Sequence, residues 1–145
     1  MKVKYILAIL ALTATVSGQN VDRLIEALVR TESNGNAAAI GDRGKAFGIL
    51  QIHEVMVHDF NRITGKNYKH EDMFDEVKAR YVARGVLNFY SKHIEKTMNR
   101  KATEKELAFI WNGGAGSWRR VASPMSDNKQ KNLEAYWAKV YKNLN

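Results

Sequence analysis

Residues 21–36 read VDRLIEALVRTESNGN, and this stretch decides the fold of the chain. Its apolar side chains recur at spacings of three and four, which predicts one stripe on a helix of about 12 residues. These side chains are Val21, Leu24, Ile25, Leu28 and Val29. We expect Asn20 or Asp22 to cap the start of this helix. The pattern stops at residues 32–35, Glu-Ser-Asn-Gly, where asparagine and glycine favour the end of a helix.

Further helical patterns follow this stretch. Apolar stripes predict a helix from Ile49 to Gly65, one over residues 75–94, one that opens at Thr103 and one over residues 133–144. The spacing of Thr103 and Glu106 is that of a capping box. Residues 34–47 are typical of a loop, with a small hairpin turning at residues 41–44. The sequence therefore predicts a mainly α-helical domain with at most a small β-hairpin.

A different pattern occupies the first 18 residues. Lys2 and Lys4 give a cationic start, residues 5–12 are apolar without a break, and Ser17-Gly18 offers small residues for cleavage. This is the three-part pattern of a secretory signal peptide. The apolar run is shorter than the roughly 20 residues of a membrane-spanning helix, and the lack of a polar face disfavours a helix of the core. We expect a signal peptide over residues 1–18 and a domain over residues 19–145, secreted or periplasmic, with no stable membrane anchor after cleavage.

Composition narrows the possible partners. The chain has 145 residues, a net charge of +8 and no cysteine, which excludes a disulfide scaffold, a thiol nucleophile and a thiolate zinc site. The charge alone fits nucleic acid, a membrane surface or a cell-wall polymer. Export favours the wall polymer, and no motif that reads nucleic acid accompanies the charge. Without clustered metal-ligand spacing we expect no metal and no cofactor, and we interpret the four histidines as surface or boundary residues: His53, His58, His70 and His93.

Glu32 is the carboxylate that stands out by position. It lies where an amphipathic helix ends and a glycine-asparagine loop begins, with Leu28 one turn before it on the same face. A carboxyl group at the edge of an apolar face tends to have its pKa raised by desolvation. A raised pKa is what a general acid near neutral pH requires. From the residues alone, a solvated glutamate at a helix end is an equally open reading.

Four segments together resemble one known family. Residues 31–36, TESNGN, resemble the glutamate–serine motif of the superfamily of soluble lytic transglycosylases and goose-type lysozymes. Residues 48–52, GILQI, are similar to its Gly-Leu-Met-Gln-Ile segment, and residues 110–114, IWNGG, to its Ala-Tyr-Asn-Ala-Gly segment. Residues 134–140, EAYWAKV, are similar to its closing helix. The four motifs occur in the family's order and cover nearly the whole predicted domain.

The resemblance implies a lysozyme-like helical fold with a cleft for peptidoglycan glycan strands. It makes Glu32 the catalytic acid, which protonates the oxygen of the β-1,4 bond between N-acetylmuramic acid and N-acetylglucosamine. The C6 hydroxyl of the muramic acid then closes on C1 and forms 1,6-anhydromuramic acid, so that one carboxyl group suffices. The substrate-binding residues it implies are Ser33, Gly48, Gln51, Trp111, Asn112 and Tyr136. Trp111 departs from the family pattern, because tyrosine is usual at its position.

Each implied role has a structural alternative. Ser33 and Asn112 suit the end of a helix, Gly48 a turn, Gln51 the polar face of a helix, and Tyr136 the core. The implied chemistry also leaves open a hydrolytic muramidase, in which Asp42 activates water about 6.5–9.5 Å from the acid. A non-catalytic cationic protein that binds the cell wall is the third reading. We expect a monomer in each case.

Overall fold

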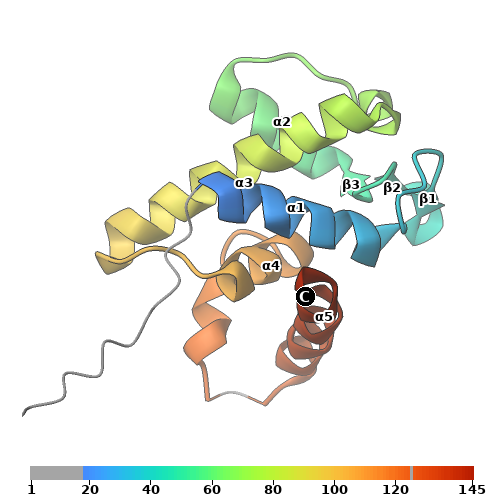
Figure 1. Cartoon of the computed structure of the whole chain (residues 1–145). Coiled ribbons are helices and arrows are strands. Elements are labelled where there is room, and N and C mark those ends of the chain that lie inside the picture. Colours follow the sequence, from blue (N-terminus) through green and yellow to red (C-terminus); the bar gives the residue numbers. More distant parts are fainter. Residues whose placement is uncertain (1–17, 125) are drawn as a thin grey trace, which may run out of the picture.

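The computed structural model describes residues 18–124 and 126–145 and is mainly helical, as predicted. The α-helices are α1 (Gly18–Glu32), α2 (Glu54–Thr64), α3 (Glu76–Met98), α4 (Glu104–Gly113) and α5 (Asn128–Leu144). Short 3-10 helices connect them: η1 (Asp42–Gly44), η2 (His70–Phe74) and η3 (Ser117–Ala122). Helix α1 contacts α3, α4 and α5, and Figure 1 shows it between α3 on one side and α4 with α5 on the other.

A small antiparallel sheet lies beyond the C-terminal end of α1 (Figure 1). Its strands are β1 (Ile40–Gly41), β2 (Ala46–Phe47) and β3 (Ile52–His53), in the order β1-β2-β3. Ile40 pairs with Phe47, and Ala46 pairs with His53. The predicted hairpin at residues 41–44 is therefore confirmed, and a third strand extends it.

The predicted cap of the first helix is wrong. Helix α1 begins at Gly18, so Asn20 and Asp22 both lie inside its first turns. The Asp22 carboxylate instead accepts a hydrogen bond of 2.8 Å from Arg84 of α3. The predicted signal peptide lies outside the described residues, apart from Gly18. Within residues 18–124 and 126–145 no helix is long and apolar enough to cross a membrane.

The predicted start of the second helix is also wrong. Ile49 lies in a turn and Ile52 in β3, and helix α2 begins only at Glu54. The backbone around them cannot be helical, because Gly48 and Gln51 both have positive φ, at 74° and 48°. Both isoleucines are fully buried, so their spacing reflects the core and not a helix face. The predicted end at Gly65 is confirmed by its left-handed C-cap.

The remaining helices match the predicted pattern. Asp75 caps α3 by accepting from the backbone N–H groups of Val77 and Lys78. The capping box of α4 is confirmed, because Thr103 and Glu106 each accept a bond from the other's backbone N–H. These caps satisfy N–H groups that the helices themselves leave unpaired.

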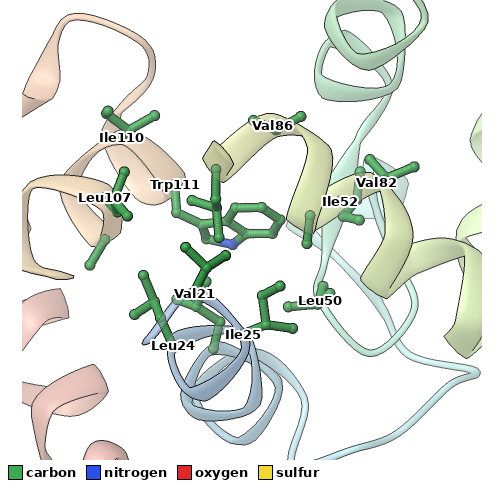
Figure 2. Packing of buried hydrophobic residues seen from close by; sticks show 14 of the residues in the cluster. Val21, Leu24, Ile25, Leu50, Ile52, Val82, Val86, Leu107, Ile110 and Trp111 are labelled. Carbon is green, nitrogen blue, oxygen red and sulfur yellow. The ribbon is translucent and has the colours of Figure 1, made fainter. Parts of the chain in front are cut away.

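The core surrounds Trp111, the most buried of the predicted site residues on α4. Figure 2 shows its indole among side chains of four segments. They are Val21, Leu24 and Ile25 of α1, Val82 and Val86 of α3, Leu107 and Ile110 of α4, and Leu50 and Ile52 beside the sheet. Burial of each such side chain stabilises the fold by about 1.5–3 kcal/mol. This packing fixes the end of α1 relative to α4 and the sheet.

Candidate active site

Glu32 is the last residue of α1, and two other helices approach its carboxylate. The Tyr136 hydroxyl, from α5, donates a hydrogen bond of 2.5 Å to Glu32 Oε1. The Trp111 side chain, from α4, hydrogen-bonds the same carboxylate. Sequence positions 104 residues apart are thus brought into contact by the docking of α5 on α1. The carboxyl group is held in one place from three directions.

Burial raises the pKa of the Glu32 carboxyl group above its ordinary value. The hydrogen bonds from Tyr136 and Trp111 and the charge of Lys139 oppose this shift but do not cancel it. The C-terminal end of α1 adds a partial negative charge beside the group. Burial and the neighbouring Glu32 also raise the pKa of Tyr136, which therefore keeps its proton and remains the donor. The site thus favours a protonated Glu32, the form a general acid needs.

The Glu32 carboxyl group faces a cavity of about 260 Å³ between α4 and the sheet. Its lining residues are Glu32, Asp42, Ala46, Gln51, His53, Met56, Trp111 and Asn112. A second cavity of about 350 Å³ shares four of them, His53, Met56, Trp111 and Asn112. Its other walls are largely apolar, with Val86 and Tyr90 from α3 and Ile110 from α4. The two cavities adjoin and form one elongated cleft, polar at Glu32 and apolar beyond Trp111.

Gln51, Asn112 and Asp42 reach the same cavity from three sides. The Gln51 side-chain amide donates to the carbonyl oxygens of Ala39 and Gly48, at 3.2 and 3.0 Å, which fixes its orientation. Asn112 lies exposed near the end of α4. Asp42 lies in η1 on the sheet side. The structure therefore gathers Glu32, Gln51, Trp111, Asn112 and Asp42 around one cleft. Tyr136 lines neither cavity and contacts the site through its hydrogen bond to Glu32.

Ser33 and Gly48 instead hold the loops in place. The Ser33 hydroxyl donates to the Ile49 carbonyl oxygen at 2.8 Å and accepts from the Asn36 backbone N–H at 3.1 Å. A Cβ atom on Gly48 would lie 1.9 Å from the Met73 carbonyl oxygen. The close backbone approach at Gly48 is thus to η2, and Gly48 lines neither cavity. Ser33 thus joins the end of α1 to the turn that carries Gln51, and Gly48 lets that turn pack against η2.

Sequence reasoning missed three residues that line the cavity at Glu32, namely Ala46, His53 and Met56. His53 directly follows the GILQI segment, and its Nε2 lies 3.5 Å from Asp42 Oδ2. The signal that could have found His53 is its position in the chain. Successive side chains of a strand point to opposite faces, so when Ile52 points into the core, His53 points away from it. Within the described part of the chain no group of three or more His, Asp or Glu side chains could hold a metal ion.

Comparison with protein families identifies the family of this chain. The family model described as the transglycosylase SLT domain matches residues 10–134, which is most of the chain. The chain therefore belongs to the transglycosylase SLT domain family, and its activity is of the peptidoglycan lytic transglycosylase type. Proteins of this family act on peptidoglycan in the cell envelope. A search of curated proteins found no match.

Proposed function

We propose that this protein cleaves the β-1,4 bond between N-acetylmuramic acid and N-acetylglucosamine, with Glu32 as general acid and then base. The observation that carries the proposal is the half-buried Glu32 carboxyl group, held by Tyr136 at the polar end of an elongated cleft. Burial raises the pKa of Glu32, so the carboxyl group holds its proton to higher pH than an exposed glutamate does.

The reaction runs in two steps. Glu32 protonates the leaving oxygen as the bond to C1 breaks through an oxocarbenium-like transition state. The C6 hydroxyl of the same muramic acid then attacks C1, and its proton passes to the ionised Glu32. The Tyr136 hydroxyl donates to the carboxylate between the two transfers. The product is 1,6-anhydromuramic acid, and Glu32 ends protonated as it began.

Three residues of the cleft are proposed to bind the glycan: Gln51, Trp111 and Asn112. The Trp111 indole, on the wall shared by both cavities, offers an edge to sugar rings. Asn112 is free to hydrogen-bond an N-acetyl or hydroxyl group, while Gln51 presents an amide already oriented by two carbonyl oxygens. We assign Ser33 and Gly48 the supporting role of placing the Gln51 turn. The protein is proposed to act as an exported monomer, without a membrane anchor once residues 1–18 are removed.

Product analysis on purified peptidoglycan tests the proposal. The parent protein is expected to release muropeptides that end in 1,6-anhydromuramic acid. Glu32→Gln keeps the shape of the side chain and removes the acid, so release should fall by about a hundredfold or more. Glu54→Gln is the matched control, because Glu54 is an exposed carboxylate that lines neither cavity. A parent protein that binds the wall without releasing any product would favour the non-catalytic reading.

A second candidate is hydrolysis by a muramidase, favoured by one observation. Asp42, in η1 between β1 and β2, lines the same cavity as Glu32. A second carboxylate there can serve a water molecule that attacks C1. Exclusively free reducing ends in the products, without the anhydro sugar, would replace the transglycosylase reading with this one.

A further inference from the structure

His53 and Asp42 form a second polar group in the cleft, distinct from Glu32 and its partners. His53 Nε2 lies 3.5 Å from Asp42 Oδ2, and both residues line the cavity that Glu32 faces. Both side chains are partly exposed, at 43% and 59%, so solvent reaches the pair. The pair comes from β3 and η1, whereas Glu32 comes from α1. It therefore lines the same cavity as the acid from different elements of the fold.

The backbone that carries Asp42 adopts an unusual conformation. Asp42, Arg43 and Gly44 have consecutive positive φ angles of 44°, 54° and 87°. Only glycine adopts this region freely, so Asp42 and Arg43 are held there by the strands on either side of the turn. Non-glycine residues in this region cluster at functional sites. Here the strained turn directs Asp42 toward His53 and the cavity.

We propose that the Asp42–His53 pair activates water, so that the enzyme partitions its substrate between cyclisation and hydrolysis. This inference rests on the proposed cleavage by Glu32. His53 Nε2 and Asp42 Oδ2 lie 3.5 Å apart, and a hydrogen bond from Nε2–H to the carboxylate would leave Nδ1 as the unprotonated acceptor. A separation of 3.5 Å is long for that bond, but such bonds often tighten when a substrate is bound.

The hydrolytic branch balances as follows. Glu32 gives its proton to the leaving oxygen, and the electron pair of the C1–O bond stays with that oxygen. A water oxygen then forms the new bond to C1, and its proton passes to His53 Nδ1. The imidazolium is stabilised by the Asp42 carboxylate and returns its proton through solvent to Glu32. The cyclisation branch uses Glu32 alone, so loss of the pair affects the ratio of the two products.

Mass spectrometry of the muropeptides measures that ratio, because the anhydro product is lighter by one water molecule. The parent protein should give both products. His53→Ala should lower the hydrolysed share about tenfold or more, while formation of the anhydro product stays within about threefold, in line with loss of a general base. Asp42→Asn, which keeps the shape of the turn residue, should shift the ratio in the same direction. His58→Ala is the matched control, because His58 pairs with Glu54 outside both cavities.

Each outcome has one meaning. The proposed role of the Asp42–His53 pair is contradicted if neither His53→Ala nor Asp42→Asn changes the product ratio. It is also contradicted if the parent protein forms only the anhydro product. Both results leave the proposed function intact. Equal loss of both products in His53→Ala, with an unchanged melting curve, also contradicts the proposed activation of water. His53 would then contribute to substrate binding in both branches. A parent protein that releases no product overturns the proposed function, and the pair falls with it. Only a shifted ratio with unchanged anhydro formation supports the inference.

Discussion

Replacement of Tyr136 by phenylalanine should shift the pH dependence of catalysis toward higher pH. The change removes the 2.5 Å hydrogen bond to Glu32 Oε1 and keeps the aromatic ring that packs against the core. That bond stabilises the ionised carboxylate and so lowers the pKa of Glu32 against the effect of burial. Without it, the pKa of Glu32 should rise further, and Glu32 should keep its proton to higher pH.

The size of the effect follows from the strength of the bond. Hydrogen bonds to charged groups contribute about 1.5–3 kcal/mol. Each 1.36 kcal/mol corresponds to one pH unit in a titration, so the lost bond corresponds to about one to two units. Trp111 still bonds the carboxylate and the site is only partly closed, so we expect the lower end, about one unit.

The assay is the rate of muropeptide release as a function of pH. Activity that needs a protonated Glu32 falls as the pH rises through its pKa, and this alkaline limb should lie about one unit higher in Tyr136→Phe. Tyr141→Phe is the control, because Tyr141 lies on the same helix, is 56% exposed and does not contact Glu32. An alkaline limb that stays in place, or moves to lower pH, would refute the assignment of Tyr136 as a donor to the acid.

Three other substitutions probe stability. The pKa of Glu32 is raised in the folded state, so the ionised form of this side chain destabilises the fold. Glu32→Gln should therefore raise the Tm at pH 7. The gain in Tm should vanish below the ordinary carboxyl pKa, where Glu32 is protonated in both the folded and the unfolded chain. Glu106→Ala should lower the free energy of unfolding in urea by about 2–4 kcal/mol, because it removes the buried carboxylate that pairs with Arg100 and caps α4. Glu104→Ala, at the more exposed pair with Arg23, should lower it by less than about 1 kcal/mol. The pKa of Glu106 is lowered, so this loss should shrink in acid; a loss independent of pH would contradict the ion pair. Gly48→Ala should lower the Tm far more than Gly35→Ala. Both glycines have positive φ, but only at Gly48 would the added Cβ atom clash with a backbone carbonyl, that of Met73. Equal losses of Tm would refute that contact.

The helices could be predicted from the sequence where the apolar period is long. The apolar stripe from Val21 to Val29 predicted α1, because the spacing of apolar residues is a local signal. The capping box at Thr103 predicted the start of α4, because its hydrogen bonds are also local. The turn at Gly48 and Gln51 could not be found in this way. Ile49 and Ile52 point into the core from a turn and a strand, and three-residue spacing alone does not distinguish that from a helix.

Part of the cleft lining could be predicted from the sequence, whereas the contacts between its residues could not. The resemblance named Glu32 and Tyr136, but no local pattern shows that Tyr136 donates to Glu32, since their contact depends on the packing of α5 against α1. His53 escaped notice because a lone histidine carries no spacing signal. Its significance depends on Asp42, which only the pairing of β1, β2 and β3 brings near.

The separation of 104 residues between Glu32 and Tyr136 has a consequence for the timing of activity. Helix α5 is the last helix that the structure describes, so a chain in which α5 has not yet docked on α1 contains Glu32 without its hydrogen-bond donor. The proposed acid and its hydrogen-bond donor meet only when the last helix docks on the first, so the proposed activity requires the completed fold.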